Sequence, residues 1–217
     1  ELTPGTDSQN ESALPSLEDS GAPAPSITRD VLLTALTSVA LLVGNVVTLA
    51  LLAQRGSEAV FAPYNLVRRL AVGLLPVLCI GMNLGLVRFL PGQNAYDRNR
   101  LTRLALGLFA STIVAATGVV SVLRPTVATS MPLLRDAAVY WAGWLNVVAT
   151  AVLAMMYALF RAEFKQSRAN ILNLGAVTVV PLIVVAAAPG SWSAAPILLW
   201  TGWGTLVTSL VFSATHL

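Results

Sequence analysis

Six long apolar segments, separated by short polar connections, follow residue 30 of the chain. Each is close to the roughly 20 residues that an α-helix needs to cross a bilayer, and none shows the alternation typical of a membrane strand. The pattern predicts an all-α, polytopic membrane protein. We expect six transmembrane helices in one bundle spanning 30–217, at about 31–53, 66–90, 103–123, 136–160, 170–188 and 196–214.

The segment before the first helix has a different character. Residues 1–30 contain six acidic residues and one arginine, a net charge of −5, whereas the remainder of the chain has a net charge of +8. A Ser-, Pro- and acid-rich segment buries too little apolar surface to offset the entropy of ordering. We expect residues 1–29 to form a disordered acidic tail and not a signal peptide, because no basic start precedes a short apolar stretch.

Composition supports the membrane assignment. Hydrophobic residues make up 56% of the chain, charged residues 11%, and the mean hydropathy is +0.74, whereas a soluble domain carries roughly 25% charged residues. A basic membrane domain usually meets phosphate headgroups or anionic lipid-linked substrates. We therefore expect anionic lipids among its partners and no nucleic acid.

Lysine and arginine residues predict the orientation. Eight of them fall on one side of the six helices and five on the other, so the positive-inside rule places the more basic side, with both termini, in the cytoplasm. This predicts a multi-pass protein of the cytoplasmic (inner) membrane. The basic connections on that side contain Arg88, Arg98, Arg100, Arg103, Arg161, Lys165 and Arg168. Two interpretations are open: these residues are topology signals, or some of them recruit an anionic lipid headgroup.

Little in the chain indicates catalysis. Only four acidic residues follow residue 30, namely Glu58, Asp97, Asp136 and Glu163, and all lie in connections or at helix ends. No metal-binding or nucleophile motif is present, and the single cysteine, Cys79, excludes a disulfide within the chain. We expect no enzyme activity, no cofactor and no metal site.

Each apolar segment carries a row of small or polar residues at helical spacing. The rows include Thr34, Ser38, Asn45 and Thr48; Arg69, Gly73, Pro76 and Asn83; Gly107, Ser111, Gly118 and Ser121; Asn146, Thr150 and Tyr157; Asn173, Val177 and Pro181; and Thr201, Thr205 and Thr208. Either these rows surround a hydrated cavity, or they let the helices pack and hydrogen-bond closely. The sequence leaves both interpretations open.

Two adjacent arginines, Arg68 and Arg69, interrupt the second segment near its start. They diverge by about 100° on a helix, so at most one is expected to face the bundle interior. An arginine at a helix end can extend to the headgroups, or its planar fork of donors can hold a diphosphate. Because Arg69 shares a row with Asn83, we rank it first as a cavity residue, followed by Arg68, with Asn45, Asn83 and Asn146 completing the set.

Backbone features suggest where the helices bend or meet. Pro76 and Pro181 each remove a hydrogen bond in mid-span, and act either as static kinks or as hinges. Gly81 and Gly85 form a G-x-x-x-G pair, which predicts a close helix contact.

Two stretches resemble a known family. The end of the second segment, GMNLGLVRFLP (81–91), and the basic connection FRAEFKQSRANILN (160–173) resemble the polysaccharide flippases. These are the Wzx-type lipopolysaccharide and O-antigen exporters of the multidrug/oligosaccharidyl-lipid/polysaccharide superfamily. The segment NLVRRL (65–70) is similar to the lipid II flippase branch, in which a cavity arginine lies on the second helix; that match would map onto Arg68 or Arg69.

The resemblance covers about residues 31–175. It implies two six-helix lobes, alternating access between them, and an undecaprenyl-diphosphate-linked saccharide as cargo for cell-envelope polysaccharide biosynthesis. Since the chain holds one lobe, we expect a missing second lobe in a longer protein, or a homodimer. The predicted function is flipping of a lipid-linked oligosaccharide. Two alternatives remain: a drug or small-solute exporter of the same superfamily, and a non-transporting membrane scaffold for a glycan-assembly enzyme.

Overall fold

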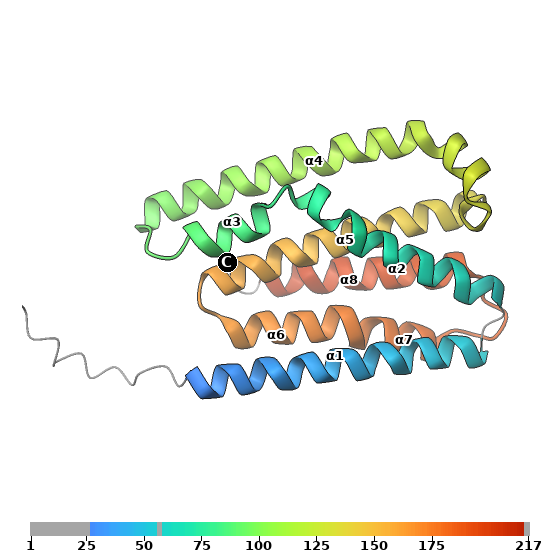
Figure 1. The fold of residues 1–217 in the computed structure, drawn as a ribbon, viewed down its shortest axis with the longest axis horizontal. Helices are drawn as coiled ribbons and strands as arrows, with labels where there is room; N and C mark the ends of the chain where they lie inside the picture. Colours follow the sequence, from blue (N-terminus) through green and yellow to red (C-terminus); the bar gives the residue numbers. More distant parts are fainter. Residues whose placement is uncertain (1–26, 56–57, 215–217) are drawn as a thin grey trace, which may run out of the picture.

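The computed structural model describes residues 27–55 and 58–214, and these residues are helical with no strand. The helices run nearly parallel or antiparallel in an elongated bundle (Figure 1). In order they are α1 (Ile27–Arg55), α2 (Glu58–Cys79), α3 (Met82–Phe89), α4 (Ala95–Ser130), the 3₁₀ turn η1 (Pro132–Leu134), α5 (Ala137–Ala162), α6 (Gln166–Leu174), the π-helical turn η2 (Gly175–Val179), α7 (Val180–Ala187) and α8 (Ala194–Ala214). The predicted acidic tail lies outside the described residues, except that residues 27–29 begin α1.

The predicted class of protein is confirmed at the level of its helices. Five helical stretches are long and apolar enough to cross a membrane, and the bent pair α2–α3 makes a sixth if it counts as one span. The stretch from α6 through η2 to α7 forms one of the five. The chain therefore has the architecture of an all-helical, multi-pass membrane protein.

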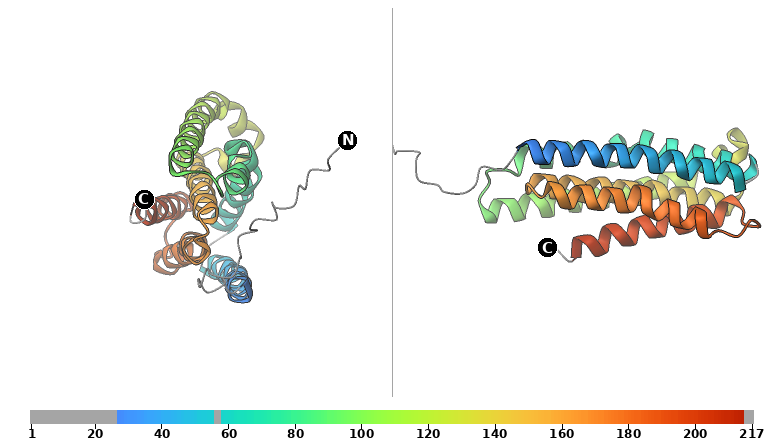
Figure 2. Two further views of the ribbon diagram at one scale, coloured as in Figure 1. Left: turned by 90° about the vertical axis from the view of Figure 1, so that its left-hand side faces the viewer. Right: turned by 90° about the horizontal axis from the view of Figure 1, so that it is seen from below.

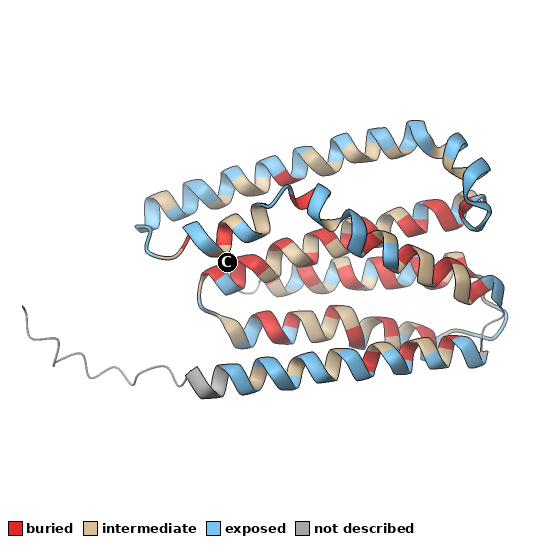
Figure 3. Ribbon diagram, viewed as in Figure 1, coloured by how far each residue is buried: buried red, intermediate tan, exposed pale blue. Residues whose placement is uncertain are grey.

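Helix α5 forms the centre of the bundle. In its most apolar window 56% of the residues are buried, compared with 11% in α1 and 6% in α4. The end-on view places α5 between the other helices, and burial is concentrated along it (Figures 2 and 3). Small residues make this possible because they let neighbouring backbones approach closely; the buried small residues of α5 are Ala142, Gly143, Ala149, Ala151, Ala158 and Ala162.

Two glycines mark the tightest helix contacts around α5. A Cβ atom at Gly143 would lie 2.9 Å from Val67 Cγ2 of α2, and one at Gly202 of α8 would lie 3.0 Å from Leu145 Cγ of α5. The predicted contact at Gly81 and Gly85 is wrong for this chain. A Cβ atom at either position would meet nothing within 4 Å, so neither glycine lies at a close helix contact.

The second predicted span is not one straight helix. It divides into α2 and α3, which are bent by 57° relative to each other. Ile80 and Gly81 have positive φ angles of 45° and 69°, a left-handed conformation that stops the helix and favours glycine. The bend thus lies at Ile80 and Gly81, four residues beyond Pro76, whereas the sequence had suggested Pro76 itself.

Helix α4 is longer than predicted, at 36 residues instead of about 21. At its start, the Asn94 side chain accepts a hydrogen bond from the Asp97 backbone N–H at 2.9 Å, which caps the helix eight residues before the predicted boundary. At its end, the helix continues past Pro125 to Ser130. Polar flanks therefore extend the helix beyond the apolar core that hydropathy detects.

The small and polar row of α4 faces away from the bundle. Gly107, Ser111, Gly118 and Ser121 are all exposed, so in this bundle the row neither lines a shared interior nor packs against another helix, the two interpretations that the sequence left open. Their hydroxyls bond instead to carbonyls one turn earlier, as Ser111 does to Gly107 O and Ser121 does to Thr117 O. Such bonds satisfy a serine or threonine inside lipid without any cavity.

The predicted alternation of the connections between the two ends of the bundle is confirmed (Figure 1). One end of the bundle gathers the start of α1, the α3–α4 connection, the α5–α6 connection and the end of α8 (Figure 1). We call this the basic end, because it carries Arg88, Arg98, Arg100, Arg103, Arg161, Lys165 and Arg168. The opposite end contains the start of α2, η1 and the α7–α8 connection.

Helix α1 is held against η2 by a contact that tolerates no side chain at Gly44. A Cβ atom there would overlap the buried Thr178 side chain. We predict that Gly44→Ala lowers the free energy of unfolding by about 1–3 kcal/mol through overpacking. Gly118→Ala is the matched control, because a Cβ there meets open space and alanine is the better helix former. Thermal unfolding of both variants in one detergent measures the difference; equal melting temperatures would contradict the contact.

Candidate functional site: a polar cavity between α2, α5, α7 and α8

A cavity of about 170 Å³ lies between α2, α5, the η2–α7 stretch and α8. Its polar lining residues are Tyr64, Arg68, Asn146, Thr150, Thr201 and Thr205. Four separate segments of the chain contribute to it, and each presents its polar residues on the face that meets the others. The predicted convergence of polar side chains therefore occurs, although on four helical segments and not on six.

Arg68 is the one charged side chain in the cavity lining. It is half-buried, and its Nη2 donates a hydrogen bond to Asn45 Oδ1 of α1 at 2.8 Å. The described residues provide no carboxylate for it: their salt bridge joins Lys165 to Glu163 at the basic end of the bundle. The cavity consequently contains a positive charge whose hydrogen-bond partner is a neutral amide, that of Asn45.

The cavity lies deep within the membrane-spanning part of the bundle. Arg68 is the eleventh residue of α2, Asn146 the tenth of α5 and Thr201 the eighth of α8, and all three helices start at the same end (Figure 1). At 1.5 Å per residue these positions lie about 10–15 Å from that end. The hydrocarbon core of a bilayer is about 30 Å thick. The three residues thus place the cavity about a third to a half of the way along these helices.

Two hydroxyl groups of the cavity lack a protein partner. The Tyr64 hydroxyl and Thr201 Oγ1 are buried with no hydrogen-bond partner in the described structure. Tyr64 and Thr201 are only 1% and 5% exposed. A buried hydroxyl without a partner costs about 1–3 kcal/mol, so native proteins rarely keep one without a ligand or water to bond it.

The remaining polar groups of the cavity have their hydrogen bonds satisfied within the bundle. Asn146 Nδ2 donates to Ala142 O at 2.8 Å and to Leu198 O at 2.6 Å, which joins α5 to α8. Thr205 Oγ1 donates to Ala176 O at 3.1 Å, which joins α8 to η2. These bonds fix the cavity walls, whereas Arg68, Tyr64 and Thr201 keep capacity for a ligand.

The irregular backbone beside the cavity has a specific cause. Pro181 lacks an N–H group, and the turn before it, η2, widens so that the Val180 N–H bonds to Gly175 O, five residues back. Ala176 and Pro181 line the cavity. Such π-helical turns are rare and frequently occur at functional sites.

The ranking of Arg69 over Arg68 does not agree with the structure. Arg69 is exposed and does not line the cavity, whereas Arg68 does. Asn83 also lies outside the cavity, half-buried in α3 beyond the bend, whereas Asn146 lines it. Asn45 reaches the site through its hydrogen bond to Arg68.

Tyr64 is the cavity residue whose place the sequence did not indicate, since we expected a connection there. Because α2 already begins at Glu58, Tyr64 lies one turn before Arg68 on the same face. The usable signal was the acidic residue Glu58, which is typical of a first helical turn.

Comparison with models of known protein families, with curated proteins and with solved structures finds no match to the chain. The described residues also hold no group of three or more His, Cys, Asp or Glu side chains that could bind a metal ion.

Two threonines one turn apart on α8 test whether the unpartnered hydroxyl serves a ligand. Thr205→Val removes the hydrogen bond to Ala176 O and should lower the free energy of unfolding by about 1 kcal/mol. Thr201→Val removes a hydroxyl that has no partner, so we expect unfolding to change by less than about 0.5 kcal/mol. Unfolding in detergent without ligand compares the two, and an equal loss in both variants would show that the Thr201 hydroxyl is already bonded.

Proposed function

We propose that the cavity binds an oxyanion at mid-membrane depth and that the chain is one lobe of a flippase for a lipid-linked, diphosphate-bearing saccharide. The observation that carries the proposal is Arg68, which lines the cavity about 15 Å along α2 from its start and has no carboxylate partner among the described residues. The same cavity is lined by Tyr64 and Thr201, whose buried hydroxyls lack partners. Ionisable residues that face the interior of a membrane bundle are costly and usually mark a substrate or ion pathway.

The chemistry of the lining favours an anion with several oxygen atoms. Arg68 offers a planar fork of charged donors, which suits phosphate or carboxylate oxygens. The Tyr64 and Thr201 hydroxyls can each donate one more hydrogen bond to the same group. A cation would be repelled by Arg68, and an apolar solute would leave both hydroxyls unbonded.

The size of the cavity limits what it holds. At about 170 Å³ it is smaller than the roughly 300–1,000 Å³ of typical ligand pockets. The proposal therefore assigns the cavity to the charged diphosphate alone. The polyprenyl chain would remain in the lipid, and the saccharide would occupy space that opens when the lobe moves.

Movement of the lobe completes the proposed mechanism. In the two-lobed arrangement that the sequence resemblance implies, a second lobe or a second copy of this chain would form the opposite wall of the pathway. Alternating access would then expose the bound diphosphate first to one side and then to the other. Two spans of this lobe already contain irregular backbone where such movement could occur. One has the π-helical turn before Pro181, and the other has the bend at Ile80 and Gly81.

Replacing Arg68 tests the oxyanion site directly. We predict that Arg68→Gln in the detergent-solubilised chain lowers the affinity for a short-chain prenyl diphosphate by roughly 10- to 100-fold, since a charge-assisted hydrogen bond contributes about 1.5–3 kcal/mol. Isothermal titration calorimetry measures the change. Arg68→Lys keeps the charge but loses the planar fork. Its affinity for the prenyl diphosphate should therefore lie between that of the unmodified chain and that of Arg68→Gln.

Arg69 supplies the matched control, because it is adjacent, equally charged and exposed. Arg69→Gln should bind the prenyl diphosphate within twofold of the unmodified chain and support export of the lipid-linked saccharide in cells at equal protein abundance. The proposal would be wrong if Arg69→Gln lost binding and Arg68→Gln kept it.

A further inference from the structure

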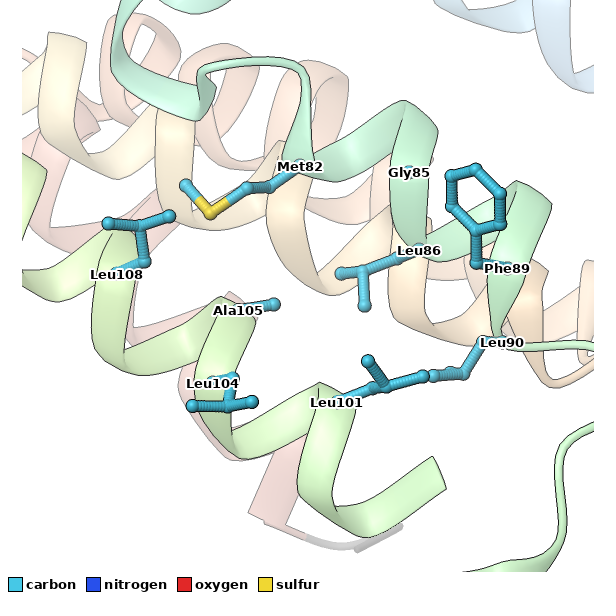
Figure 4. Close-up of a pocket in the computed structure, with 9 residues that line it drawn as sticks. All are labelled: Met82, Gly85, Leu86, Phe89, Leu90, Leu101, Leu104, Ala105 and Leu108. Carbon is cyan, nitrogen blue, oxygen red and sulfur yellow. The ribbon is translucent and has the colours of Figure 1, made fainter. Parts of the chain in front are cut away.

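An apolar groove of about 240 Å³ separates α3 from the first half of α4 at the basic end of the bundle. The lining residues are all apolar. Met82 and Leu86 of α3 point toward the side chains of α4, whereas the Phe89 ring points away from the gap (Figure 4). The groove exists because the bend at Ile80 and Gly81 redirects α3 onto α5, while α4 buries only Phe109. It is separate from the Arg68 cavity, with which it shares no residue.

The dimensions of the groove fit a hydrocarbon chain. The residues that line it on α4 run from Leu101 to Leu108, which corresponds to about 10 Å of helix. An acyl chain is flexible and narrow, and it can lie along an open apolar groove of this length.

Arginines lie on either side of the groove at the basic end of the bundle. The row of α4 that lines the groove runs from Leu101 to Leu108. Measured around the helix axis at 100° per residue, Arg98 lies about 70° to one side of this row and Arg100 about 90° to the other, whereas Arg103 lies about 150° away. On α3, the Arg88 guanidinium lies 5.7 Å from the centre of the Phe89 ring, and Phe89 itself lines the groove.

The charge at this end is strongly unbalanced. Residues 82–108 contain four arginines and one acidic residue, Asp97. Asp97 is held by Asn94, whose Nδ2 donates to Asp97 Oδ2 at 2.9 Å in the helix cap. The described part of this region thus presents net positive charge beside an apolar slot, a combination that favours a lipid with an anionic phosphate headgroup over a zwitterionic one.

We propose that the α3–α4 groove is a binding site for an anionic phospholipid, with one acyl chain between α3 and α4 and the phosphate headgroup held by Arg98 and Arg100. This site is independent of the proposed transport cavity and does not rest on it. A lipid seated there would fill the gap that the bend in the second span creates and would bridge α4 to the remainder of the bundle.

The test uses the full chain in detergent and native mass spectrometry with added phosphatidylglycerol or phosphatidylcholine of identical acyl chains. We expect phosphatidylglycerol to remain bound at least tenfold more often than phosphatidylcholine. Removing the two headgroup arginines, in Arg98→Gln with Arg100→Gln, should lower phosphatidylglycerol affinity by roughly 30-fold. The matched control, Arg103→Gln with Arg168→Gln, removes the same charge from outside the groove and should change affinity by less than about threefold.

A second pair of variants tests the part of the site that would hold the acyl chain of the lipid. Gly85 lines the groove, and a Cβ atom there meets nothing within 4 Å, so the side chain of Gly85→Leu starts in open space and occupies part of the groove. Gly107→Leu is the control, because Gly107 also faces open space but does not line the groove. Phosphatidylglycerol with a photoactivatable acyl chain should crosslink to residues 82–108 in the unmodified chain and in Gly107→Leu, and lose at least 80% of that crosslinking in Gly85→Leu.

Each outcome decides the proposal. Equal retention of the two phospholipids, equal effects of the two arginine pairs, or undiminished crosslinking in Gly85→Leu would each overturn it. Melting temperatures measured without added lipid establish that all variants are folded, so that a loss of binding reports on the site.

Discussion

The energetic constraint on this protein is the positive charge of Arg68 inside the membrane-spanning part of the bundle. Placing an arginine at the centre of a membrane helix costs about 2.5–3.5 kcal/mol on insertion scales. Its hydrogen bond to Asn45 at 2.8 Å offsets about 1.5–3 kcal/mol of that cost. The remainder requires a polar surrounding, and the close approach of α2 and α8 to the small residues of α5 brings the hydroxyls of Tyr64 and Thr201 there.

The existence of the helices could be predicted from the sequence, because a segment in lipid must satisfy its backbone internally and hydropathy alone detects such segments. Their limits could not. Helix α4 begins at the cap formed by Asn94 and ends at Ser130, beyond Arg124 and Pro125. These residues are not apolar, so a hydropathy profile places the end of the span before them. Proline in a long helix reads as a stop in sequence, yet here the helix continues past it.

The sequence predicts the kind of site, a polar interior with one arginine, but not which of the two arginines faces it. An arginine on the second span is predicted to face a polar interior, and the sequence ranks Arg69 first because Arg69 shares a row with Asn83 on a continuous helix. That inference assumed one continuous helix. The bend of 57° at Ile80 and Gly81 removes any fixed angular relation between the residues on its two sides. The inward face of α2 is instead defined by Tyr64 and Arg68, which lie one turn apart in the unbroken part of the helix.

The irregular backbone and the cavity have a common explanation. A membrane protein tolerates non-α backbone only where neighbouring groups satisfy it or where it lines a cavity. Both conditions hold at η2, because the Thr205 hydroxyl bonds to the Ala176 carbonyl and the same stretch forms one wall of the space around Arg68. Pro181 makes a regular α-helix costly at this point, so the widened turn persists without a ligand. The wall nearest the proposed oxyanion is therefore the part of the bundle that is least constrained to α-helical geometry.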